Sequence, residues 1–369
     1  CIRDRATGRR GNLALRKPVF CMGISISELK ESVQYNCSIS DATHAGQYTL
    51  CIYLLKMREF YRWEQGLGFN DRIDNEKIGQ WLTLQEEQWE QLESEPLAPV
   101  QVNGNSFDAF DSESINEAIN SEGLVYSAGY VLRGKPHFFL AELEQRHFQD
   151  DYQILISGRE LARELSAPPA LSQGRNIFIR SESLRRTIWE KVEESLWNKS
   201  RSPLVRAIEC YDFKNNLEAS LQDMCDKELQ TLVCHEIGEI KAGAMIGATS
   251  WAGLLSDVQG TALELMLRAI RDNLADCLST LPDLIETDDP ARLHFYIATL
   301  TNMRHSIFPS LRAAYDDWHS SGSMAYLHDI SAKGEEHWCN IANRAIEIYK
   351  TAGTDRLDEF ESLIEANAL

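Results

Sequence analysis

One short run, from Cys234 to Glu239 (CHEIGE), brings an imidazole and two carboxylates within about one and a half turns of a predicted helix. His235 and Glu239 are four residues apart, so their side chains project from the same helix face and can present two ligands to one metal ion. Glu236 is close enough to act as a third ligand or as a general base. The run differs from the His-Glu-x-x-His zinc motif, because Glu239 stands where that motif has its second histidine.

The helix predicted to carry this run extends from about residue 217 to residue 246. Its apolar side chains recur at helical spacing, and Glu236 projects from the middle of the stripe that they form. An ionised carboxylate in an apolar setting is strongly destabilising, so Glu236 needs a cation, a metal ion or a proton as its partner. The stripe consists of Leu229, Leu232, Val233, Ile237 and Ile240.

A second apolar stripe, between Leu293 and Trp318, has Arg304 at its centre. Because guanidinium stays protonated in proteins, a buried Arg304 requires a carboxylate or a bound anion. We expect it to pair with Glu236 or Glu239. Two interpretations remain open: an architectural ion pair, or a catalytic site in which Glu236 is the acid or base and Arg304 holds the carboxylate or phosphate of a small anionic ligand.

A metal site on the first helix would need further ligands from elsewhere in the chain. His294 and His305 are eleven residues apart, or about 16 Å on a continuous helix, so at most one of them can reach the same ion. Pro309 removes the hydrogen bond to the carbonyl of His305 and is predicted to kink this helix. His305 is therefore the candidate additional ligand beside His235 and Glu239. A divalent metal ion is the candidate cofactor, and its identity is unknown from the sequence.

Composition excludes some classes of protein. The chain has 369 residues, 43% of them hydrophobic, and a formal net charge of −19. Such an acidic chain argues against non-specific binding to nucleic acid or to an anionic membrane surface, since both need a basic surface. The sequence contains no run of about 18 apolar residues, which argues against a membrane span. Small ligands and protein partners remain as candidates.

The first 21 residues differ from the rest of the chain. They contain six basic residues and one acidic residue, and the first methionine is Met22. We expect residues 1–21 to be a non-native or disordered leader. The chain also has nine cysteines without a Cys-x-x-Cys pair. This usage is typical of a reducing compartment and predicts a soluble, cytoplasmic protein.

The predicted fold class is mainly α with a small antiparallel β element. An N-terminal α+β domain over residues 22–180 is followed by an all-α C-terminal helical domain over residues 181–369. Within the first domain, a capping box at Ser25 opens a short helix, and a long helix is expected from His44 to Glu64. Strands are expected at residues 124–132, 137–143, 152–157 and 176–180, paired in antiparallel fashion.

Three stretches near the start, residues 33–37 (VQYNC), 40–46 (SDATHAG) and 53–64 (YLLKMREFYRWE), resemble the opening of an uncharacterised bacterial protein family. The resemblance extends from about Met22 to the end of the chain. It implies a bacterial cytoplasmic protein and a foreign leader. The family carries no established activity, so the resemblance implies no cofactor, substrate or catalytic residue.

Standard catalytic signatures are missing from the sequence, including G-x-G-x-x-G, the Walker loop and G-x-S-x-G. Two function classes therefore remain. The first is an enzyme or metalloprotein whose site surrounds His235, Glu236, Glu239 and Arg304. The second is a non-catalytic protein-interaction or scaffold protein, in which these charges fix the helix register and the acidic surface meets a partner.

Overall fold

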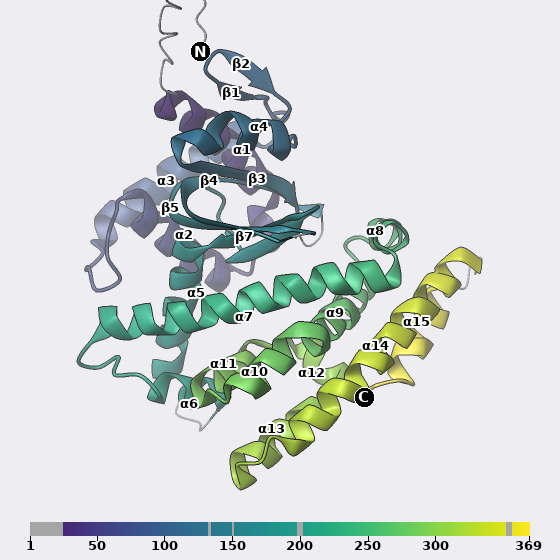
Figure 1. Ribbon diagram of the computed structural model, residues 1–369. Helices are drawn as coiled ribbons and strands as arrows, with labels where there is room; N and C mark the ends of the chain where they lie inside the picture. The colour runs from purple at the N-terminus through teal and green to yellow at the C-terminus, as the bar shows by residue number, and fades with distance from the viewer. Residues whose placement is uncertain (1–24, 132–133, 150, 198–201, 352–355) are drawn as a thin grey trace, which may run out of the picture.

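The computed structural model describes residues 25–131, 134–149, 151–197, 202–351 and 356–369. An N-terminal part that combines helices with two sheets is followed by a C-terminal part made of helices (Figure 1). The predicted fold class is thereby confirmed. The expected leader, residues 1–21, lies outside the described residues.

Three helices precede the sheets: α1 (Ile26–His44), α2 (Leu50–Glu64) and α3 (Asn75–Leu92), with the short helix η1 (Ala45–Gln47) between α1 and α2. The long helix expected from His44 to Glu64 is therefore divided, and α1 is longer than expected. The predicted capping box is also wrong, because the Ser25 side chain makes no cap hydrogen bond. The helix α3 does have a side-chain cap, since the Asp74 carboxylate accepts from the amides of Glu76 and Lys77.

The strands form two sheets. A two-stranded hairpin pairs β1 (Val100–Val102) with β2 (Asn105–Phe107). The larger sheet has the order β3-β4-β5-β7-β6 and comprises β3 (Leu124–Tyr130), β4 (Pro136–Phe148), β5 (Gln153–Arg163), β6 (Ala170–Gln173) and β7 (Asn176–Arg180). The four predicted strands match β3, β4, β5 and β7.

The predicted antiparallel pairing needs one correction, because β5 and β7 are parallel. The reason is β6, which was not predicted. This short strand pairs with β7 as an antiparallel hairpin and takes the sheet edge. The chain thus returns through β6 before β7 joins β5 in the same direction.

The larger sheet is curled. Register shifts interrupt the pairing of β4 with β5 between Leu140 and Gln145, as β-bulges do when they bend a strand. The two edge strands approach each other, since Ser127 Oγ on β3 donates to Gln173 Oε1 on β6 at 3.5 Å. The face enclosed by the curl carries an apolar cluster, with Arg180 stacked on the ring of Phe139 beside it. The cluster is formed by Val125, Phe139, Ala141, Leu155 and Phe178.

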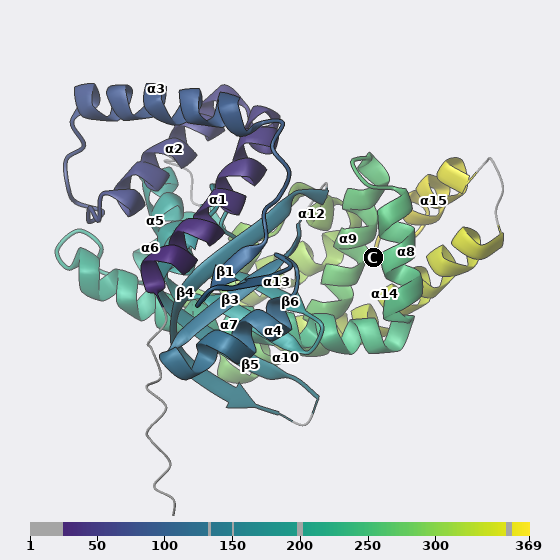
Figure 2. The same ribbon diagram turned by 90° about the horizontal axis from the view of Figure 1, so that it is seen from above.

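Helices cover the outer side of the curled sheet (Figures 1 and 2). The helix α1 and the helix α4 (Ser112–Ile119), which is followed by η2 (Asn120–Glu122), pack on β3 and β4 through residues such as Leu29 and Ile115. The long helix α7 (Leu217–Ile246) packs on β5 and β7, where Val233 meets Ile156 and Ile179. This second contact joins the C-terminal helices to the sheet.

Most helices of the C-terminal part share one large apolar core that includes Leu267, Trp338 and Tyr315, whereas α5 (Ser181–Trp197) and α6 (Pro203–Glu209) pack with the start of α7 in a second, smaller core. Among the described residues, no helix has the length and apolar content needed to cross a bilayer. The remaining helices, besides α5, α6 and α7, are α8 (Ala248–Asp257), α9 (Ala262–Ala275), α10 (Leu281–Thr287), α11 (Pro290–Thr299), α12 (Asn302–Ile307), α13 (Pro309–Ser321), α14 (Ala325–Thr351) and α15 (Arg356–Glu365).

The second predicted stripe lies on three helices instead of one kinked helix. The chain leaves helical geometry at Leu300, whose ψ is 135°, and α12 begins after Thr301, whose side chain accepts from the amide of Arg304. A second break precedes Pro309, which is the first residue of α13, where a proline is well tolerated. The kink expected at His305 is therefore a break between separate helices.

Candidate metal centre

A glycine lets the two helices of the candidate centre approach closely. Gly238 on α7 faces the backbone of Ala275 at the end of α9, and a Cβ at this position would lie 2.2 Å from the Ala275 carbonyl oxygen. His235 and Glu239 flank Gly238 in the sequence, whereas Asp272 and the following turn flank Ala275. The crossing point therefore brings polar residues of two helices together.

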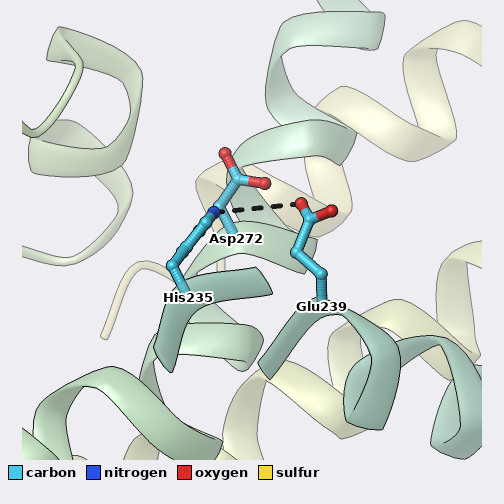
Figure 3. A group of neighbouring side chains, drawn as sticks. All are labelled: His235, Glu239 and Asp272. Carbon is cyan, nitrogen blue, oxygen red and sulfur yellow. Dashed lines mark ion pairs between the residues drawn. The ribbon is translucent and has the colours of Figure 1, made fainter. Parts of the chain in front are cut away.

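Three side chains converge at this crossing: His235 and Glu239 from α7, and Asp272 from α9 (Figure 3). One ligand atom from each lies within 4.8 Å of the other two. His235 Nε2 and Glu239 Oε1 are 3.9 Å apart, and the two side chains are 24% and 14% exposed. This half-open position contrasts with the sealed core around it and gives solvent a route to the cluster.

The imidazole of His235 is held from its other side. Its Nδ1 lies 2.7 Å from Asp276 Oδ1, so the Nδ1–H donates to this carboxylate and Nε2 faces Glu239. In metalloproteins, ligating histidines commonly donate their second ring N–H to a carboxylate in this way, because the hydrogen bond fixes the tautomer and the ring orientation.

Asp276 is the centre of a buried hydrogen-bond network. It accepts from Thr280 Oγ1 at 2.7 Å, from the Tyr296 hydroxyl at 2.7 Å and from the Arg304 guanidinium, in addition to His235. Arg304 Nε also donates to Asn273 Oδ1 at 2.9 Å. Burial would raise the pKa of Asp276, but the Arg304 and His235 charges outweigh it and hold this pKa well below its usual range.

The helix changes its winding where Asp276 begins. Residues Asp276–Thr280 form a π-helical turn, η4, between α9 and α10. A π-turn has one more residue per hydrogen-bonded ring than an α-turn, and such turns are frequent at functional sites. It displaces the following side chains from α-helical register, so Asp276 and Thr280 point together at His235.

Charges at the centre shift the pKa values of its ligand candidates in opposite directions. Burial would lower the pKa of His235, but Asp276 outweighs it and raises the pKa to about 10. Burial would raise the pKa of Glu239, but Arg271 outweighs it and lowers the pKa. Burial and then the Glu239 charge raise the pKa of Asp272, which shares a hydrogen bond with Glu239. The two carboxyl groups thus share the position where a cation would have to bind.

Glu239 has two further partners. Arg271 on α9 donates to Glu239 Oε1 at 2.7 Å, and its side chain is one quarter exposed. Ser172 on β6 donates to Glu239 Oε2 at 3.3 Å. The carboxylate is thus already neutralised by an arginine that can turn towards solvent, and it also contacts the N-terminal sheet.

Glu236 is buried, as its place in the apolar stripe predicted, and its Oε2 has no hydrogen-bond partner among the described residues. Burial and then the neighbouring Glu239 raise the pKa of Glu236 to about 8. A carboxyl group with this pKa keeps its proton at neutral pH. The requirement for a partner is therefore met by a proton and not by the predicted arginine.

The expected pairing of Arg304 with Glu236 or Glu239 is wrong. Arg304 is buried as expected, but its partners are Asp276 and Asn273. The three-residue group near 235 does not include His305. Its ring is instead near Arg312 and hydrogen bonds the backbone of Ile297, because Arg304 faces Asp276 and the next side chain in a helix diverges by about 100°. Of the predicted residues, His235, Glu236 and Glu239 do lie together.

Asp272 and Asp276 were missed in the sequence. They lie four residues apart in the segment RDNLADCLST, which is the same spacing as that between His235 and Glu239. Paired carboxylates on an amphipathic helix are usually solvated. Only the positions of Asn273 and Asp276 within the apolar pattern of the helix indicated that these side chains are buried. A search for all pairs of potential ligands at this spacing would have found them.

Two family models together match most of the chain. Residues 28–180 match the N-terminal domain, and residues 185–367 the C-terminal domain, of a family of unknown function, DUF6866. The chain belongs to this family. Comparison with curated proteins gave no match, and comparison with solved structures gave none either. The resemblance to an uncharacterised family is confirmed in that form. Any DUF6866 activity must therefore be inferred from the geometry described above.

Proposed function

We propose that this DUF6866 protein binds a divalent metal ion between α7 and α9, through His235, Glu239 and Asp272. The single observation that carries the proposal is the convergence of one imidazole nitrogen and two carboxylate oxygens within 4.8 Å. The hydrogen bond from His235 to Asp276 supports it, because it leaves Nε2 directed at the other two ligand candidates.

The donor set narrows the choice of ion. One imidazole and two carboxylates favour Zn²⁺, Mn²⁺ or Fe²⁺ over Ca²⁺, which prefers oxygen ligands alone. Three protein ligands leave at least one coordination position for water or for a ligand, as in catalytic rather than structural zinc sites. Arg271 would have to release Glu239, and its partial exposure permits that movement.

Two predicted catalytic residues have different places in this proposal. Glu236 is a protonated, buried carboxyl beside Glu239 and is suited to act as a general acid or base towards a metal-bound molecule. Arg304 is instead a positioning residue, because it holds Asp276, which in turn orients His235. An anionic ligand of this site would meet Arg271 rather than Arg304.

Metal analysis on protein purified without a polyhistidine tag tests the proposal, followed by calorimetric titration with ZnCl₂ and MnCl₂. We expect one ion per chain. His235→Asn and Asp272→Asn should each weaken binding by more than the roughly 10–100-fold that loss of an outer hydrogen-bond partner typically causes. His328→Asn is the matched control, because His328 is exposed and distant from the three ligand candidates in the sequence.

The alternative is that the charges only hold the helices together, as in a scaffold or protein-interaction protein. It predicts that His235→Asn lowers stability while ion binding is absent or unchanged. Equal affinity of the wild-type protein, His235→Asn and His328→Asn would contradict metal binding at this centre. Loss of binding in Asp272→Asn with an unchanged melting temperature would exclude the purely architectural role.

A further inference from the structure

A small cavity lies between α2, the end of β5 and the start of α5. Its volume is about 20 Å³, which is enough for a water molecule or a monatomic ion and too little for an organic substrate. Three basic side chains line it: Lys56 from α2, Arg163 from β5 and Arg186 from α5. The hydroxyl-bearing residues Ser183 and Thr187 of α5 complete this side of the wall.

Two of these cations have an N–H group without a partner. Arg163 is only 4% exposed, and its Nη1 makes no hydrogen bond among the described residues. Arg186 is also buried, and its Nε likewise has no acceptor, although its other nitrogens bond the Glu59 carbonyl and the Glu182 carboxylate. A buried guanidinium N–H without an acceptor is costly, so both groups call for a ligand that accepts hydrogen bonds.

Nearby carboxylates do not fully balance these cations. The closest carboxylate to Arg163 belongs to Glu160, at 3.6 Å, and Glu160 is already bonded by Arg180 at 2.8 Å. Burial and the neighbouring Arg186 and Arg180 charges lower the pKa of Arg163. The pKa of Lys56 is also lowered, because burial and the Arg163 charge outweigh the Glu190 charge, which raises it. The cavity is thus surrounded by cations that repel each other.

The two acidic residues of the wall are Glu59 and Glu190. Glu59 Oε1 is bonded by Arg58 at 2.8 Å, and Glu59 Oε2 lies 4.0 Å from Arg186 Nη1, so this carboxylate balances the cavity's cations only in part. Burial raises the pKa of Glu59, and its Oε2 has no hydrogen-bond partner among the described residues. Water is the competing occupant of the cavity, because it can accept from the same unpartnered N–H groups.

We propose that this cavity is a binding site for a small inorganic anion, with chloride as the physiological occupant. Arg163 Nη1 and Arg186 Nε would donate to the ion, and Lys56 would supply charge from the more open side. The site is independent of the proposed metal centre, which lies on α7 and α9. It ties α2 to β5 and α5, so the anion would contribute to the stability of the N-terminal part.

The test compares the melting temperature of the full chain in sodium chloride with that in sodium gluconate, at equal ionic strength and pH. A ligand at concentration c that binds only the folded state stabilises it by RT ln(1 + c/Kd), so chloride should raise the melting temperature by a few degrees, and the rise should grow with the logarithm of the chloride concentration above Kd. Lys56→Met should remove most of this rise. Lys77→Met on α3 is the matched control, because Lys77 is exposed and should leave the rise unchanged.

Lys56 is chosen because it is half-buried and has no ion pair within 4 Å among the described residues, so its replacement should not unfold the protein. A bromide-soaked crystal provides the direct observation, as an anomalous peak within hydrogen-bond distance of Arg163 and Arg186. Identical melting temperatures in chloride and gluconate would overturn the proposal. So would a chloride effect that Lys56→Met retains, or a water molecule in the cavity of the bromide-soaked crystal.

Discussion

Among the described residues, two clusters of buried charge, one in the N-terminal part and one in the C-terminal part, differ in construction. The N-terminal cluster centres on Arg180, which is 0% exposed and bonds Glu160 at 2.8 Å and Glu164 at 3.2 Å. It is made of arginines and carboxylates. The C-terminal cluster contains a histidine, and its members His235 and Glu239 are partly exposed. Guanidinium groups cannot bind metal ions, whereas a half-open imidazole beside carboxylates can.

Two histidines show the same contrast. Burial lowers the pKa of His137, whose side chain is beside the N-terminal cluster, to about 4. His235 has its pKa raised to about 10 because Asp276 outweighs burial. Burial alone thus does not decide the charge of a histidine. Asp276 keeps His235 protonated at neutral pH, so a metal ion that binds Nε2 would have to displace that proton.

The largest effect is expected from Arg180→Met. It removes the cation that Glu160 and Glu164 share and leaves two carboxylates in a sealed environment, so we expect a loss of about 3 to 5 kcal/mol in the free energy of unfolding. Urea denaturation measures it. The control is Arg159→Met, whose ion pair with Glu142 is exposed at 69% and 46% and should contribute little. Similar losses in both variants would show that the N-terminal cluster is not the sealed network described above.

A pH-dependent effect of intermediate size is expected from His137. Its folded-state pKa of about 4 lies below the ordinary value of 6.5, so the unfolded chain binds more protons between these values. Stability is therefore fully present above about pH 6.5 and is lost as the pH falls towards 4, by up to about 3 kcal/mol.

His137→Leu should remove this acid-side slope, because leucine cannot bind a proton in either state. Denaturation curves between pH 4 and pH 7.5 compare the two proteins. The slopes of wild type and variant should diverge below pH 6.5. Parallel curves over the whole range would mean that His137 titrates normally and that the contrast with His235 is not real.

The smallest effects on stability are expected from two glycine substitutions in α7, one of them where α7 crosses α9. Gly238→Ala places a Cβ against the Ala275 carbonyl and should cost about 1 to 3 kcal/mol through forced helix separation. Gly243→Ala on the same helix meets no atom closer than 3.9 Å and should instead stabilise by about 1 kcal/mol. Thermal unfolding separates the two signs, and metal titration should show weaker binding only in Gly238→Ala. Stabilisation by both changes would show that close approach does not hold the centre together.

Much of the fold could be predicted, because the pattern of apolar residues along the sequence indicates helices and strands directly. The short apolar run of β3 and the 30-residue pattern of α7 are examples. The parallel pairing of β5 with β7 could not be predicted, since it depends on the four-residue strand β6, whose sequence ALSQ carries no strand signal. The breaks at Leu300 and before Pro309 were underestimated, because one apolar stripe continues across three helices.

The candidate centre was only half predicted for a related reason. Spacing within one helix placed His235 and Glu239 on a shared face, and this prediction is independent of tertiary structure. Which residue faces them depends on how helices cross, and here Gly238 and the π-turn at Asp276 decide it. A buried arginine and a buried glutamate suggested a pair, but Arg304 pairs with Asp276, and Glu236 is neutralised by a proton.

The bond from Ser172 to Glu239 makes one carboxylate a thermodynamic link between the two family segments. Its Oε2 accepts from β6 at 3.3 Å, while its Oε1 faces His235. A ligand that binds Glu239 changes the strength of the hydrogen bond from Ser172 of β6. Ligand binding at the centre and the packing of α7 on the sheet are therefore linked by a coupling free energy. Such coupling is reciprocal. A partner that strengthens the contact between the sheet and α7 would therefore change the affinity of the centre for its ligand by the same factor.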